Sequence, residues 1–127
     1  MTKKTKLLSL IPPEFDVGWS KFSFVIKKNL KDDDDSKCFG ITDFNKFIIS
    51  LDEGMSDKEA HHTIIHECCH ALVDALGLGG PEEGVADKIE TTNEIFTETT
   101  CRSFLMFKNL NPHLWDILFV DYYKRIE

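Results

Sequence analysis

The longest hydrophobic pattern in the chain covers the residues from about Asp57 to Leu76, about five turns of helix. From Ile64 to Leu76 most positions are apolar, apart from a short segment of histidine and glutamate and Asp74. A helix that is apolar nearly all round is usually buried. Ser56 followed three residues later by Glu59 predicts a capping box at its start, and Gly77 predicts its end. We therefore expect a buried helix here.

Before this helix, apolar and polar residues alternate with the period of a β-strand. Phe22, Phe24 and Ile26 would form one apolar face of the first strand-like region. Two shorter apolar runs follow, and the residues between them favour a turn. We expect a small antiparallel sheet of about three strands. Its strands are predicted within residues 15–30, at 38–41 and at 46–51, with the turn at 43–45.

The remaining segments predict loops and a second long helix. Four consecutive aspartates within residues 31–37 are typical of a solvated hairpin loop. A glycine-rich link at residues 77–84 leads to a second helix at about 85–109. Asn111-Pro112 ends that helix and begins an amphipathic C-terminal segment, residues 113–127. Residues 1–13 are expected to be a lead-in that Pro12-Pro13 terminates.

We interpret residues 1–127 as a single α+β domain, in which the small sheet packs on the central helix and the second long helix. A chain of 127 residues with 42% hydrophobic residues can bury one core without disulfides. Its 4 cysteines form no Cys-x-x-Cys pair, so we expect reduced thiols and a cytoplasmic protein. The net charge of −7 argues against a nucleic-acid partner, and no stretch is long enough for a membrane.

The centre of the predicted helix carries His66-Glu67-Cys68-Cys69-His70, a His-Glu-x-x-His motif. Residues four apart lie on one face of a helix, so His66 and His70 can bind one metal ion. Glu67 lies at the edge of that face, where it can accept a proton from a water molecule on the metal. Two imidazoles, an open coordination position and a carboxylate are what zinc-dependent hydrolysis needs. The alternative is that these are surface histidines paired with Glu67.

A catalytic zinc site usually has a third protein ligand. Glu90, Glu94 and Glu98 follow one another at intervals of four on the second predicted helix, so they share one stripe. If this helix folds back after the glycine link, the stripe faces the motif helix. We favour Glu94 as the ligand, with Glu98 and Glu90 as alternatives, and Glu98 also suits a carboxylate that orients a ligating histidine. All three could instead face solvent.

Other side chains are weaker candidates for the site. His113 is a competing third ligand, but it lies beyond the helix break at Asn111-Pro112. His61 and His62 precede the motif and are expected to have a surface role, although His62 could line the cleft. Tyr122 and Tyr123 could donate to an oxyanion, but aromatic packing is the default for both.

The order of these features resembles a group of small proteins. Gly40-Ile41-Thr42-Asp43, an apolar strand, the motif helix, a glycine link and a glutamate-rich helix ending in Asn-Pro follow one another between about Phe15 and Pro112. This order is similar to the minimal zincins of bacteriophages and bacteria, of the ImmA/IrrE-type and SprT-like group. The resemblance implies Zn²⁺ held by His66, His70 and a glutamate such as Glu94, with Glu67 as general base and Glu98 as a candidate for the acidic residue that follows. The stretch around Asn93-Glu94 departs from the usual ImmA/IrrE-type pattern.

The leading hypothesis is therefore a zinc-dependent peptidase that acts on a protein or peptide substrate, in the host cytoplasm if a phage encodes it. In this hypothesis the substrate chain adds to an exposed edge of the sheet. The alternative is a zinc-stabilised module of a phage that binds a protein and cuts nothing.

Overall fold

The computed structural model describes residues 6–77 and 89–125, and the side chains of these residues except 89–97. The fold is α+β, as predicted, and combines a sheet with three main helical segments. In chain order the elements are the 3₁₀ helix η1 (Leu7–Ser9), strands β1 (Glu14–Asp16), β2 (Lys21–Lys27), β3 (Gly40–Asp43) and β4 (Ile48–Asp52), helices α1 (Asp57–Ala75), α2 (Ile89–Leu110) and α3 (Pro112–Asp116), the π-helical segment η2 (Ile117–Asp121) and helix α4 (Tyr122–Arg125).

The sheet has four strands in the order β1-β2-β4-β3, and it is mixed rather than antiparallel. Two features of the chain account for the difference from the predicted three strands. A tight turn at Gly18, whose φ is +101°, divides the first strand-like region into the antiparallel pair β1 and β2. The segment after β2 leads to β3, which lies at the other edge of the sheet and is not hydrogen-bonded to β2. As a result β4 inserts between β2 and β3, parallel to β2 and antiparallel to β3.

Aspartate side chains shape the two predicted turns. In the exposed loop at residues 31–37, the Asp32 carboxylate accepts hydrogen bonds from the backbone N–H groups of Asp34 and Ser36. In the turn between β3 and β4, the Asp43 carboxylate accepts from the N–H groups of Asn45 and Lys46. Both turns were predicted, but the first does not join neighbouring strands, because β4 lies between β2 and β3.

Helix α1 begins and ends as the sequence predicts. The Ser56 hydroxyl accepts from the Glu59 N–H and the Glu59 carboxylate accepts from the Ser56 N–H, so the capping box is complete. At the other end Gly77 has a φ of +83°. The first helical residue, Asp57, also binds both flanks of the fold. Its carboxylate accepts from the Leu7 N–H at 2.9 Å and from the Arg125 guanidinium at 3.0 Å.

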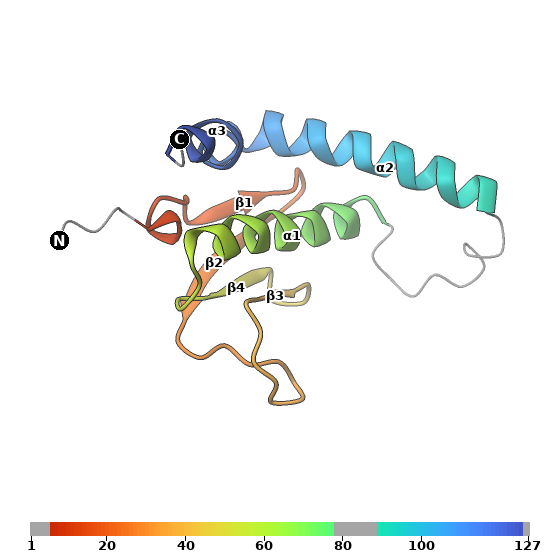
Figure 1. Cartoon of the computed structure of the whole chain (residues 1–127). Helices are drawn as coiled ribbons and strands as arrows, with labels where there is room; N and C mark the ends of the chain where they lie inside the picture. Colours follow the sequence, from red (N-terminus) through yellow and green to blue (C-terminus); the bar gives the residue numbers. More distant parts are fainter. Residues whose placement is uncertain (1–5, 78–88, 126–127) are drawn as a thin grey trace.

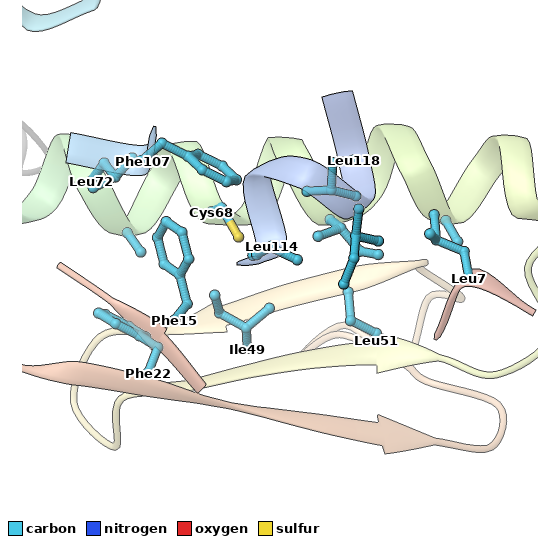
Figure 2. Close-up of a cluster of buried hydrophobic side chains, with 14 of the residues drawn as sticks. Leu7, Phe15, Phe22, Ile49, Leu51, Cys68, Leu72, Phe107, Leu114 and Leu118 are labelled. Atoms are coloured by element: carbon cyan, nitrogen blue, oxygen red, sulfur yellow. The ribbon is translucent and has the colours of Figure 1, made fainter. Parts of the chain in front are cut away.

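One hydrophobic core joins the sheet to the helices (Figure 2). The sheet contributes side chains that include Phe15, Ile49 and Leu51, all fully buried. The alternation of β2 is kept only in part, because Phe22 is buried and Phe24 packs against the core, whereas Ile26 is exposed. The other buried side chains of the core come mainly from α1 and the C-terminal segments and include Ile64, Cys68, Leu72, Phe107, Leu114 and Leu118.

The helices lie on one side of the sheet (Figure 1). Helix α1 lies over β3 and β4, and the end of α2 reaches β1, where the rings of Phe107 and Phe15 meet at 5.0 Å. The predicted break at Asn111-Pro112 is confirmed, with Pro112 as the first residue of α3. The predicted start of the second helix, at residue 85, lies outside the described residues.

The cysteines agree with the prediction of reduced thiols. All 4 cysteines carry free thiols. Burial raises the pKa of the Cys68 thiol well above its usual value and raises that of Cys69 as well. None of the helices in residues 6–77 and 89–125 has the length and hydrophobicity needed to cross a bilayer.

Candidate functional site

The two motif histidines lie one turn apart on an exposed face of α1, so the prediction of a helix buried nearly all round is wrong: α1 buries only the side that packs on the sheet and the C-terminal segments. Their Nε2 atoms converge to 3.0 Å, and their rings meet edge to face at 4.6 Å between centroids. Two nitrogen ligands of a tetrahedral zinc ion are about 3.3 Å apart, given Zn–N bonds of about 2.0–2.1 Å. The same separation makes a hydrogen bond when one ring carries its proton on Nε2. The pair therefore has the orientation and nearly the separation that shared coordination of a cation requires.

Glu67 lies between this exposed pair and the core. Only 7% of the residue is exposed, whereas the His66 side chain is 55% exposed. One carboxylate oxygen, Oε1, accepts a hydrogen bond of 2.8 Å from the Thr42 hydroxyl. The other, Oε2, lies 3.9 Å from His66 Nε2. The carboxylate therefore has one oxygen held by β3 and the other directed towards the histidine pair.

Strand β3 approaches α1 unusually closely at this point. A Cβ atom on Gly40 would lie 2.7 Å from Thr63 Cγ2 and 2.8 Å from Glu67 Cγ, both below normal contact distance. Glycine at position 40 thus allows the strand backbone to rest on the helix, next to the stem of Glu67. Thr42, two residues later, faces the same way and reaches the Glu67 carboxylate. The spacing of Gly40 and Thr42 explains how an edge strand contacts the motif helix.

The backbone of the same two residues faces away from the sheet. The N–H of Asp52 donates to the carbonyl of Phe39, which makes residues 39, 41 and 43 the ones that pair with β4. In an antiparallel pair the backbone groups of alternate residues point to opposite sides. The N–H and C=O groups of Gly40 and Thr42 therefore point to the free edge of β3, the edge that lies beside Glu67.

The three predicted candidates for the third ligand lie on α2, and the structure describes the side chain of Glu98 alone among them. The backbone of Glu90 and Glu94 lies in α2, and their side chains are outside the described residues. The Glu98 side chain is exposed and accepts a hydrogen bond of 2.9 Å from Arg102. Among the residues whose side chains are described, no group of three or more histidine, cysteine, aspartate or glutamate side chains is arranged to hold a metal. Glu94 as a ligand stays a prediction.

The two histidines that precede the motif, His61 and His62, have different surroundings. His62 is exposed, as expected for a surface residue, and its ring lies 6.0 Å from that of His66 on the same face of α1. His61 is a structural residue instead of a surface one. Its Nε2–H donates to the carbonyl of Leu118 at 2.7 Å, and its ring stacks on Tyr122 at 3.8 Å.

The remaining candidates lie among the C-terminal segments. Tyr122 is buried and Tyr123 is about half exposed, and both rings contact His61 rather than His66 or His70. The default of aromatic packing therefore describes both tyrosines. His113 lies in α3 and lines a hollow of about 290 Å³ beside β1, the strand at the opposite edge of the sheet from β3.

Thr42 is the residue of the site that the sequence alone does not indicate. Its role depends on β3 lying over α1, and no local pattern predicts the contact between two elements that far apart along the chain. Gly40 was the only available signal, because a glycine within a strand often marks close approach of another part of the molecule.

Comparison of the chain with protein-family models, with curated proteins and with solved structures finds no match.

Proposed function

We propose that the protein is a zinc-dependent peptidase that uses Glu67 as its general base. The observation that supports this proposal is the convergence of His66 and His70 at 3.0 Å, with an oxygen of the buried Glu67 directed towards them. Residues four apart already share one face of a helix, and the convergence of the two Nε2 atoms adds the orientation that a shared cation needs. A buried carboxylate likewise requires partners that offset the cost of burial.

His66 and His70 would hold the zinc ion, with Glu94 as the favoured third ligand. The donor set suits zinc, since neutral imidazole and carboxylate are common ligands of catalytic sites. When bound, zinc polarises a peptide carbonyl and increases the acidity of a water molecule. The exposure of His66 leaves room for a substrate on the solvent side of the pair.

Glu67 supplies the proton transfers. Its Oε2 would accept a proton from the attacking water and return it to the amine that leaves. The hydrogen bond from Thr42 occupies Oε1, so Oε2 is the oxygen that serves this purpose. The substrate would add to the free edge of β3 as an extra strand, because β3 is the edge strand whose Thr42 contacts the carboxylate.

The variant Glu67→Gln tests this proposal. We expect zinc bound at one equivalent, as in the wild type, and cleavage of a mixed peptide library slowed by about 10²- to 10⁴-fold. Glu53→Gln makes the same chemical change on an exposed turn and should cleave at the wild-type rate. Equal cleavage by both variants would remove Glu67 as the base. Zinc binding without cleavage by the wild type would favour the protein-binding module instead.

His66→Ala and His70→Ala test the metal site separately. Each removes one of the two converging nitrogens, so each should lower zinc affinity by at least 100-fold in a calorimetric titration. His62→Ala removes a neighbouring histidine from the same helix face and should change zinc affinity much less. Equal losses from all three variants would indicate loose binding to an exposed histidine stripe.

A further inference from the structure

We propose that Thr42 positions the base, and that it does so from the edge strand with which a substrate strand would pair. The inference deepens the proposed peptidase function, and its second part rests on that function. It concerns a residue of the edge strand, outside the motif that indicates the site.

The first step of the argument is the hydrogen bond itself. The Thr42 hydroxyl donates to Glu67 Oε1 at 2.8 Å and lies 3.3 Å from the Glu67 carbonyl oxygen. A hydroxyl has a single proton, so the shorter contact is its main bond and the carbonyl shares it weakly. Hydrogen bonds to an ionised acceptor are among the stronger ones in proteins. Thr42 therefore fixes which carboxylate oxygen faces β3 and which one faces His66.

The second step is the tight packing that supports this bond. The β3 backbone at Gly40 lies against the stem of Glu67, and nothing larger than glycine fits there without displacement. Contact at Cγ and a hydrogen bond at Oε1 restrain the glutamate at two points along its side chain. A glutamate otherwise has three rotatable bonds, so these two restraints remove most of its conformational freedom.

The third step is the position of Thr42 on the sheet edge. The same residue turns its N–H and C=O groups to the free edge and its hydroxyl to Glu67. A substrate strand that forms hydrogen bonds with the Thr42 backbone would thus bind the same residue whose hydroxyl holds Glu67. Substrate binding and base orientation then depend on one short segment, residues 40–43.

The first experiment needs neither zinc nor activity. Packing against Gly40 restrains Cγ and therefore χ1, so the informative angle is χ2, and three-bond NMR couplings across the Cβ–Cγ bond of Glu67 report whether χ2 occupies one rotamer or averages over several. We expect one rotamer in the metal-free wild type and in Thr42→Ser, which keeps the hydroxyl. Thr42→Val keeps the shape but removes the hydroxyl, so we expect averaging there. Thr42→Ala serves the same purpose if valine disturbs the fold.

The matched control is Thr63→Val. Thr63 is also buried against Gly40, one turn before Glu67, but its methyl group makes that contact. This variant should keep the single Glu67 rotamer. A fixed Glu67 in Thr42→Val and Thr42→Ala, or averaging in Thr42→Ser, would overturn the proposal.

The second experiment measures turnover by the zinc-loaded protein. Thr42→Val should lower kcat by about 10- to 100-fold, because a misplaced base loses reactivity, and should change KM less than twofold. Thr42→Ser should recover most of kcat. An equal fall in kcat for valine and serine would contradict the positioning role. Absence of cleavage by the wild type would refute the proposed peptidase, and the NMR result would still decide whether Thr42 orients Glu67.

Discussion

The two edge strands of the sheet, β1 and β3, differ in what their outward backbone groups contact. At the β1 edge, the Asn111 side chain takes the place of a further strand. Its Oδ1 accepts from the Asp16 N–H and its Nδ2 donates to the Asp16 carbonyl, both at 2.8 Å. At the β3 edge, the outward backbone groups of Gly40 and Thr42 lie beside Glu67. A side-chain amide thus occupies one edge at Asp16, and the edge next to the candidate site has the geometry to accept a strand.

If an extended chain pairs with this sheet, the difference directs it to the β3 edge. An uncovered edge invites pairing with any extended chain, so proteins commonly block the edges that they do not use. Asn111 is 8% exposed and blocks β1 with hydrogen bonds that also anchor the end of α2 to the sheet. We expect the two edges to respond differently to substitution.

The largest effect is expected from Gly40→Ala. The added methyl group would meet Thr63 and Glu67 at 2.7 and 2.8 Å, so β3 or α1 must move. We expect a loss of about 2–3 kcal/mol in the free energy of unfolding, measured by urea denaturation, since overpacking a buried contact costs this much.

The Gly40 result can be checked in a second background. Thr63→Ser removes the Cγ2 atom nearest to the new methyl group, so Gly40→Ala should cost less there than in the wild type. An equal cost in both backgrounds would show that β3 does not press on α1 at Thr63.

A smaller loss is expected from Asn111→Ala at the other edge. Two hydrogen bonds to Asp16 disappear, and the neighbouring hollow gives water access to the backbone groups left behind. We expect a loss of about 1–2 kcal/mol in the free energy of unfolding. Asn111→Asp keeps the acceptor and replaces the donor by a carboxylate oxygen facing the Asp16 carbonyl, so it should be no more stable than Asn111→Ala. Wild-type stability in Asn111→Asp would show that this edge is held by other contacts.

The smallest effect, and a pH-dependent one, is expected from Asp52→Asn. The N–H groups of Leu30 and Gly54 donate to the Asp52 carboxylate and lower its pKa, which attaches the segment leading to β3 to the end of β4. A lowered pKa in the folded state stabilises the fold above the unfolded pKa, about 4, and the contribution is lost as the pH falls through the folded value. The difference in the free energy of unfolding between Asp52→Asn and the wild type should therefore be larger at pH 7 than at pH 3, as measured by urea denaturation.

Asp33→Asn is the control for this pH experiment. It makes the same change of charge on the exposed loop and should stay within about 0.5 kcal/mol of the wild type at pH 7. A wild-type stability for Asp52→Asn at pH 7 would show that the carboxylate does not hold the segment.

The sequence predicts the parts of the molecule that depend on local rules. The capping box of Ser56 and Glu59, the end of α1 at Gly77 and the break at Pro112 each depend on residues within a few positions of one another. The convergence of His66 and His70 was predicted for the same reason, because four residues make about one helical turn.

The rest depends on contacts between distant segments. The parallel pairing of β2 with β4 could not be predicted, since the strand that follows β2 in the sequence is not its neighbour. His61 and His62 are adjacent in the sequence and both on α1, yet only His61 binds Leu118. Thr42 likewise acquires its partner through the packing of β3 on α1, which residues 40–43 do not encode by themselves.

Asp57 has a consequence for anyone who shortens this chain. Its carboxylate at the start of α1 binds Leu7, in the segment before the sheet. The same carboxylate binds Arg125, in the last helix. Truncation past either residue would remove one of these hydrogen bonds to the helix that carries His66 and His70, although the cut lies far away along the chain. Affinity tags and truncations should therefore leave Leu7 and Arg125 in place.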